Sequence, residues 1–172
     1  MIEKVTIISG DKQSGKTTRL NYFVDRTTDI GGVLMPEIDG RRYFKSIKNS
    51  QIWLAEVVPG TTAELKVGRF CFSRPAFEKA NDEIITAVQN NFSTIILDEI
   101  GPLELDLKDG LYRSFDYCLH SKISIKNLIV IVRSSLCKAL LTTLNGYYNS
   151  LSLIFHKKTR NFSDSLPRDI AI

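Results

Sequence analysis

The sequence has few of the residues that build disulfide frameworks, metal sites or linkers. Cys71, Cys118 and Cys137 are far apart, and neither His120 nor His156 stands at a metal-ligand spacing from one of them. This pattern is typical of reduced thiols buried in a cytosolic protein. The five prolines and ten glycines are scattered, so no linker or low-complexity segment divides the chain, and we expect a single domain over residues 1–172.

Long apolar runs are also lacking. The first residues, MIEKVTIISG, place Glu3 before a very short apolar stretch, which is unlike a signal peptide, and no run approaches the ~20 apolar residues of a membrane helix. We therefore expect a cytoplasmic protein with no membrane partner. The net charge of +4 suits a phosphate-bearing ligand but is too small to indicate nucleic acid by itself.

Apolar, β-branched segments alternate with segments of helical periodicity along most of the chain. Strands are predicted at VTIIS, STIILDE, NLIVIV and LSLIF, because each is a short apolar run of the kind buried on both faces. Helices are predicted over 16–25, 77–88, 111–119 and 136–144, the last with Ser134 or Ser135 as its cap and Asn145-Gly146 as its stop. This alternation indicates an α/β fold with a mostly parallel sheet flanked by helices.

Residues 31–73 depart from that alternation. Turn signals divide the stretch into short strands, and the strongest of them is Asp39-Gly40, between VLMPEI and RRYFKSI. The segments IWLAEVV and RFCFS supply further strands, and Trp53 is expected in the core. We interpret this stretch as an antiparallel excursion between the first and second helices.

The strongest motif lies between the first strand and the first helix. Residues 10–17, GDKQSGKT, match the phosphate-binding pattern G-x-x-x-x-G-K-[ST] known as the P-loop or Walker A motif. Glycines allow the backbone N–H groups to converge on a phosphate, and the following helix presents its positive end to the same anion. Lys16 would contact the β- and γ-phosphates, and the Thr17 hydroxyl would bind Mg²⁺. The residues predicted to bind nucleotide are Gly10, Asp11, Lys12, Gln13, Ser14, Gly15, Lys16, Thr17 and Thr18.

A second motif, of the Walker B type, ends the strand STIILDE. Gly101-Pro102 forces a turn directly after Asp98 and Glu99, at the strand end where α/β sheets bind ligands. Asp98 would serve Mg²⁺, and Glu99 would orient or deprotonate an attacking water. Because the two residues are adjacent on a strand, their side chains start on opposite faces, and the turn must let both reach the cavity.

Several charged residues are weaker candidates. Arg41 and Arg42 follow the Asp39-Gly40 turn, where an arginine of a lid would reach the γ-phosphate and stabilise the transition state. Glu104 is either a carboxylate that supports the site or an exposed acid at a helix entry. Arg160 and Lys157-Lys158 fit a solvated charge run better than a base-binding site.

Taken together, these motifs resemble the small P-loop nucleoside-triphosphatases typified by thermophile enzymes and related to the human cancer-related nucleoside-triphosphatase. The resemblance is carried by GDKQSGKTT, GGVLMPEIDGRRYFKSI, VGRFCFSRPAFE, DEIGPLEL and TRNFSDSLPRDI, and it spans nearly the whole chain. It implies a nucleotide-kinase-like P-loop NTPase fold and slow hydrolysis of several triphosphates. The chain differs at Gln13, where the family has glycine, and at Val132-Arg133-Ser134, where it has a Thr-Val-His segment. Arg133 is therefore a further candidate for a phosphate contact.

Three functions fit these features. The first is Mg²⁺-dependent hydrolysis of a nucleoside triphosphate such as ATP or GTP, which the adjacent Asp98 and Glu99 favour. The second is a nucleotide, nucleoside or small-molecule kinase, although only Arg160 and Arg168 are available for a late arginine-rich lid. The third is a nucleotide-dependent switch acting on RNA or a protein, which no aromatic stacking motif supports. No motif specifies the base or an oligomeric state.

Overall fold

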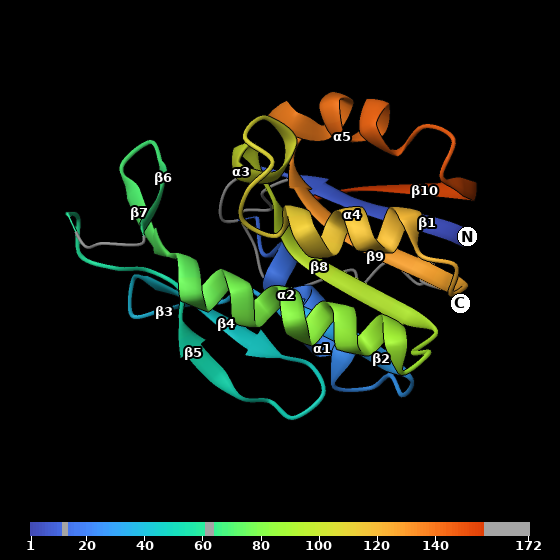
Figure 1. The fold of residues 1–172 in the computed structure, drawn as a ribbon, viewed down its shortest axis with the longest axis horizontal. Helices are drawn as coiled ribbons and strands as arrows, with labels where there is room; N and C mark the ends of the chain where they lie inside the picture. Colours follow the sequence, from blue (N-terminus) through green and yellow to red (C-terminus); the bar gives the residue numbers. More distant parts are fainter. Residues whose placement is uncertain (12–13, 61–63, 157–172) are drawn as a thin grey trace.

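The computed structural model describes residues 1–11, 14–60 and 64–156 (Figure 1). Its elements follow the chain as β1 (Ile2–Gly10), α1 (Lys16–Val24), β2 (Ile30–Leu34), β3 (Glu37–Ile38), β4 (Arg41–Ser46), β5 (Ile52–Leu54), β6 (Glu64–Val67), β7 (Phe70–Ser73), α2 (Arg74–Gln89), β8 (Thr94–Ile100), α3 (Pro102–Leu105), α4 (Tyr112–His120), β9 (Ile125–Arg133), a 3₁₀ turn (Ser134–Leu136), α5 (Cys137–Leu144) and β10 (Tyr148–His156). The four predicted strands correspond to β1, β8, β9 and β10, and the four predicted helices to α1, α2, α4 and α5.

A single sheet runs through the middle of the molecule in the order β10-β1-β9-β8-β2-β4-β3, and β5 pairs with β4. The five strands from β10 to β2 are parallel, whereas β3, β4 and β5 pair antiparallel. The strands β6 and β7 form a separate hairpin, which projects from one end of the molecule in Figure 1. The predicted α/β fold with a mostly parallel sheet is therefore confirmed.

Helices cover both faces of the parallel strands. On one face α2, α4 and α5 bury Ile84, Phe115 and Leu140 against the sheet, and on the other face α1 buries Leu20 and Val24. Covered faces explain why β8 and β9 are almost continuous apolar runs. No helix in the described ranges is long and apolar enough to span a membrane.

One strand of the predicted excursion belongs to the parallel sheet instead. Every residue of β2 is buried, and the strand pairs parallel with β8 while its last residues pair antiparallel with β4. Its glycines allow close packing, because a Cβ on Gly32 would lie 2.1 Å from the Ile96 carbonyl oxygen. The antiparallel part therefore begins only after β2, and the Asp39-Gly40 hairpin is confirmed, with φ of 50° and 75° at these residues.

The predicted cap of α5 is also different. A 3₁₀ turn precedes this helix, whose N-cap is Leu136 with no side-chain hydrogen bond. The Ser134 hydroxyl instead donates to Asp11 Oδ1 at 3.4 Å. Ser134 thus contacts the loop after β1 rather than its own helix, and Asn145-Gly146 ends the helix as expected.

The topology brings three strand ends to one edge of the sheet. β9 lies between β1 and β8, and Gly10 at the end of β1 is in register with Arg133 at the end of β9. Asp98 of β8 is paired with Ile131 of β9, two residues before Arg133. Residues from three distant parts of the sequence therefore meet beside the phosphate loop.

Candidate active site

The phosphate loop joins β1 to α1 in the predicted strand, turn and helix order. Gly15 caps α1 with a φ of 83°, a conformation that glycine adopts easily, and Lys16 and Thr17 open the helix. The Lys16 ammonium donates to the carbonyl oxygens of Gly10 (2.8 Å) and Asp11 (2.7 Å). Burial lowers the pKa of Lys16, while Glu99 and Asp98 act in the opposite direction. The ammonium group thus lies at the loop, next to the cavity.

The cavity beside this loop has a volume of about 500 Å³, within the range of small-molecule sites. Its walls come from the loop and α1, from the segment after β2, and from the ends of β8 and β9. The residues that line it are Ser14, Gly15, Lys16, Thr17, Thr18, Asn21, Leu34, Met35, Pro36, Glu37, Ile38, Arg42, Lys45, Ile52, Asp98, Glu99, Ile131 and Arg133. The phosphate loop and the acidic strand end thus open into one cavity.

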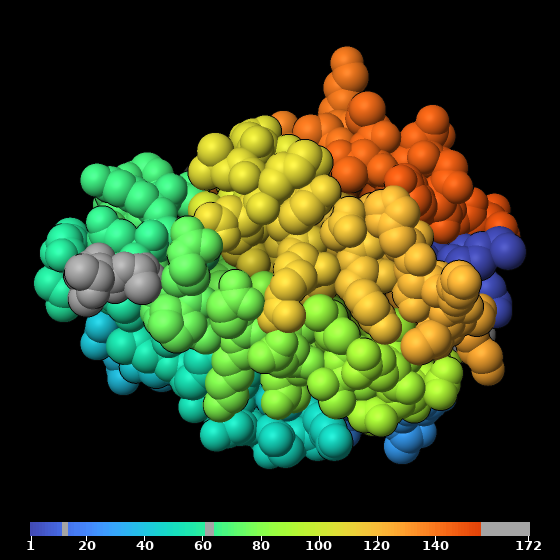
Figure 2. All heavy atoms as spheres, viewed as in Figure 1, coloured from blue at the N-terminus to red at the C-terminus, as the bar shows by residue number. Residues whose placement is uncertain are grey.

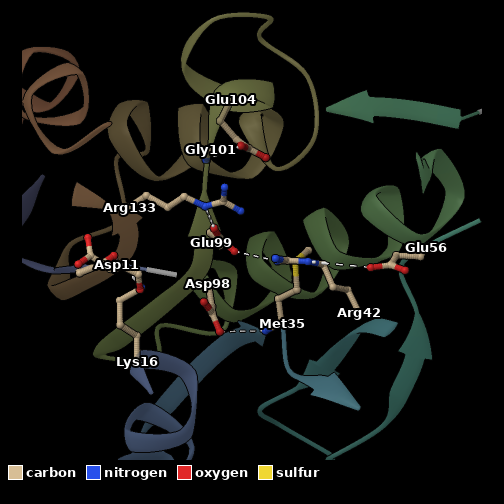
Figure 3. A network of polar contacts seen from close by, with 11 residues as sticks. Asp11, Lys16, Met35, Arg42, Glu56, Asp98, Glu99, Gly101, Glu104 and Arg133 are labelled. Carbon is tan, nitrogen blue, oxygen red and sulfur yellow. Dashed lines mark hydrogen bonds and ion pairs between the residues drawn. The ribbon is translucent and has the colours of Figure 1, made fainter. Parts of the chain in front are cut away.

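Asp98 is a buried carboxylate at the end of β8, with 1% of its surface exposed. It accepts a hydrogen bond from the Met35 backbone N–H at 3.0 Å (Figure 3). A second hydrogen bond comes from the Thr17 side chain. Burial raises its pKa to about 6, although both hydrogen bonds favour the ionised form. The two residues that the sequence assigns to Mg²⁺ are therefore in direct contact.

Glu99 lies between two arginines. Its Oε2 accepts from Arg42 Nη1 at 2.9 Å, and its Oε1 accepts from Arg133 Nε at 2.7 Å (Figure 3). Burial by itself would raise the pKa of Glu99, but the two guanidinium groups outweigh it and lower the pKa. The pairing of β8 with β9 shifts register between Asp98 and Ile100, and both carboxylates line the cavity.

The paired arginines have different environments. Arg41 is exposed and does not line the cavity, whereas Arg42 is 9% exposed and its guanidinium contacts Glu99. Arg42 also lies 4.0 Å from Glu56 Oε1 and over the Phe70 ring. Glu56 and Phe70 were missed in the sequence, because nothing in the local pattern indicates a contact with a residue on another strand.

Glu104 is neither exposed nor part of the cavity beside the loop. The side chain is 3% exposed and accepts hydrogen bonds from the backbone N–H groups of Gly101 and Leu111, both at 2.8 Å. Burial raises its pKa to about 7. The alternative of an exposed helix-entry acid is therefore wrong: Glu104 ties together the turn after β8 and the start of α4.

Some predicted residues lie outside the described ranges. They are Lys12 and Gln13 in the loop, and Lys157, Lys158, Arg160 and Arg168 near the end. Within the described ranges, no group of three or more His, Cys, Asp or Glu side chains is arranged to hold a metal ion. All three cysteines are free and buried, as expected.

Comparisons with known proteins agree with this geometry. The model of the NTPase family matches residues 5–170. The fold is similar to the crystal structure of THEP1 from the hyperthermophile Aquifex aeolicus, with a TM-score of 0.60, 20% sequence identity, and coverage of 89% of this chain and 90% of that chain. A search of curated proteins finds no match. The family model spans nearly the whole chain and includes both nucleotide-binding motifs, so the protein belongs to the NTPase family of P-loop proteins.

Proposed function

We propose that the protein hydrolyses nucleoside triphosphates, ATP and GTP among them, to diphosphate and phosphate in a Mg²⁺-dependent reaction. The observation that carries this proposal is the position of Glu99, which shares one cavity with Lys16 and Thr17 and is held by Arg42 and Arg133. A reducing cytoplasm suits the protein, because its cysteines are free thiols in the core.

The loop supplies the donors for the triphosphate. Backbone N–H groups at the start of α1 carry the positive end of the helix dipole, which favours phosphate oxygens. Lys16 donates to carbonyl oxygens of its own loop, and these hydrogen bonds are the ones that β- and γ-phosphate oxygens would replace. The exchange favours the anion, since the ammonium group then faces an opposite charge and not a neutral carbonyl dipole.

The residues beside the loop fit Mg²⁺. Thr17 and Asp98 offer a hydroxyl and a carboxylate oxygen in direct contact, and Mg²⁺ prefers oxygen ligands. Mg²⁺ commonly takes one or two protein oxygens and completes its shell with phosphate oxygens and waters. When bound, the ion neutralises charge that develops on the phosphate oxygens.

Glu99 is the group that would act on water. Its lowered pKa keeps the carboxylate ionised at neutral pH, so that it accepts a hydrogen bond from a water molecule next to the γ-phosphate. The water oxygen forms a bond to phosphorus, the bond from phosphorus to the β-phosphate oxygen breaks, and the proton passes to Glu99. Arg42 and Arg133, which contact Glu99, would stabilise the charge of the transition state through their guanidinium groups.

Phosphate release from ATP, GTP, CTP and UTP tests this function directly. We expect free phosphate and diphosphate in equal amounts when Mg²⁺ is present, and loss of turnover when EDTA removes the ion. Lys16→Ala protein, purified in the same way, controls for contaminating phosphatases. Release that persists in EDTA, or wild-type release no greater than that of the Lys16→Ala protein, would contradict the proposal.

A further inference from the structure

A second cavity lies on the other side of Glu99 from the phosphate loop. Its volume is about 220 Å³, and its walls come from the β6–β7 hairpin and from the turn that leads into α3. These segments are neighbours at one end of the molecule in Figure 2, where the hairpin is pale green and the α3 segment yellow. Hydrolysis requires only the first cavity, so this second space has no role in the function proposed above.

The two cavities meet at Glu99 and at the two arginines that contact it. Met35, Arg42, Glu99 and Arg133 line both of them. A molecule in the second cavity would therefore reach the guanidinium groups of Arg42 and Arg133, whose contacts with Glu99 are drawn in Figure 3.

The walls of the second cavity combine aromatic rings with guanidinium groups. The rings of Phe70 and Phe72 are stacked at 6.1 Å with an interplanar angle of 21°, and Phe77 meets Phe72 edge-on. The guanidinium carbons of Arg42 and Arg69 lie 5.3 and 5.2 Å from the centre of the Phe70 ring. Aromatic walls favour a flat ring, and arginines favour phosphate, which they bind through two parallel hydrogen bonds.

The carboxylates in this wall do not cancel that preference. Glu104 is occupied by two backbone N–H donors, and Glu99 is the other acid that lines the cavity, against the guanidinium groups of Arg42, Arg69 and Arg133. The volume lies below the ~300–1,000 Å³ of typical ligand pockets, so part of a nucleotide-sized ligand would lie outside it, at the junction with the first cavity.

We propose that the second cavity binds a nucleoside monophosphate, which accepts the γ-phosphoryl group in place of water. The base would pack against the hairpin phenylalanines, and its phosphate would lie at Arg42 and Arg133, where the cavities meet. This inference rests on the proposed function, because it uses the same bound triphosphate.

The transfer is balanced without any further reactant. An oxygen of the acceptor phosphate dianion forms a bond to the γ-phosphorus, and the bond between that phosphorus and the β-phosphate oxygen breaks. The leaving nucleoside diphosphate keeps the electron pair, and the acceptor becomes a second diphosphate. No proton has to move, so the step does not depend on Glu99 as a base.

Calorimetric titration of AMP, GMP, CMP and UMP into the wild-type and Lys16→Ala proteins tests the site. We expect at least one monophosphate to bind to both proteins, because Lys16 lies outside the second cavity. Arg69→Ala and Phe70→Leu should weaken that binding by about tenfold or more, the usual cost of a charged or aromatic contact. Arg26→Ala is the matched control, since Arg26 is also exposed and stacks on an aromatic ring, Tyr22, on α1.

Chromatography of the products formed from a triphosphate labelled in its γ-phosphate then measures the transfer. The proposal predicts label in the diphosphate of the added monophosphate, and less of it in the Arg69→Ala protein. In the calorimetry, the proposal is overturned if no monophosphate binds, if Lys16→Ala abolishes the binding, or if Arg69→Ala and Phe70→Leu bind like the Arg26→Ala control. In the chromatography, it is overturned if a bound monophosphate takes up no label. Phosphate release without any monophosphate is measured in parallel, so failure of the hydrolase function is seen separately.

Discussion

The two sides of the nucleotide cavity are assembled in opposite ways. On the loop side, the residues from Gly10 to Thr18 are contiguous in the sequence, between the end of β1 and the first turn of α1. On the other side, Glu99 meets Arg42 and Arg133, which are 57 and 34 residues away in the sequence. We infer that the loop side binds the triphosphate. On the other side, the charges of Glu99, Arg42 and Arg133 neutralise one another until a substrate arrives.

Lys16→Ala tests the loop side and should have the largest effect. The substitution removes the ammonium group that would contact the β- and γ-phosphates, so we expect no measurable triphosphate binding or turnover. The fold should persist, because the Lys16 ammonium contacts loop carbonyl oxygens rather than the core. Calorimetry with a non-hydrolysable analogue and Mg²⁺ measures the binding, and circular dichroism checks the fold. Wild-type affinity would mean that the loop does not bind the phosphates.

Glu99→Gln tests the other side and should separate chemistry from binding. The variant keeps shape and volume but removes the charge that orients or deprotonates water. Turnover should fall by about a hundredfold or more, the usual scale for a general base. Affinity for the analogue should stay the same or rise, because the loss of one carboxylate lowers repulsion against the triphosphate.

The control for this variant is Glu37→Gln. Glu37 lines the same cavity from β3, where it is in register with Arg42, but it is exposed, and it is Glu99 that accepts the hydrogen bonds of Arg42 and Arg133. Its replacement should affect turnover much less. If Glu99→Gln hydrolyses at the wild-type rate, the base lies elsewhere or water is not the acceptor.

A comparison of Arg42→Ala with Arg41→Ala tests the side of the cavity that contains Glu99 again, with a smaller expected effect. Arg42 is the buried member of the pair and contacts Glu99, so its loss should reduce turnover by about a hundredfold with little change in nucleotide affinity. Arg41 is exposed on the neighbouring position of β4, and its loss should cost much less. Equal effects of the two substitutions in steady-state kinetics would contradict the assignment of Arg42.

This contrast also explains how much the sequence could predict. The α/β alternation was predicted correctly, and the loop and the acidic strand end lie at the predicted positions in the fold, because each depends on spacing within a short segment. The parallel pairing of β2 with β8 was missed, since the turn signals that follow Leu34 suggested that the whole stretch was antiparallel. The short apolar sequence of β2, IGGVL, was the signal in the sequence for a strand covered on both faces.

The arginine side could be predicted only as a set of candidates. The sequence placed Arg41, Arg42 and Arg133 near the site but did not rank them. Which of Arg41 and Arg42 reaches Glu99 depends on the face of β4 from which each side chain projects. Glu56 and the hairpin phenylalanines carried no local signal at all. Their contacts arise only when separate strands are brought together, and a pattern read along one strand does not include them.

Glu104→Gln should have the smallest effect, and the effect should be on stability and not on turnover. Glu104 belongs to the same DEIGPLEL segment as Asp98 and Glu99 but does not line the cavity beside the phosphate loop. Both Glu104 oxygens accept hydrogen bonds from backbone N–H groups, whereas glutamine has one acceptor oxygen, so one buried N–H loses its partner at a cost of about 1–3 kcal/mol.

Burial raises the pKa of Glu104 from the ordinary 4.5 to about 7, so between these values the folded protein keeps a proton that the unfolded chain has lost. Stability from this group is therefore lost as pH rises through that interval, and Glu104→Gln removes this dependence. Urea unfolding should show a gap between wild type and variant that narrows from pH ~5 to pH ~8, with Glu3→Gln as the exposed control. A gap that stays constant over this range would mean that the two N–H donors outweigh burial and that the carboxylate is ionised throughout.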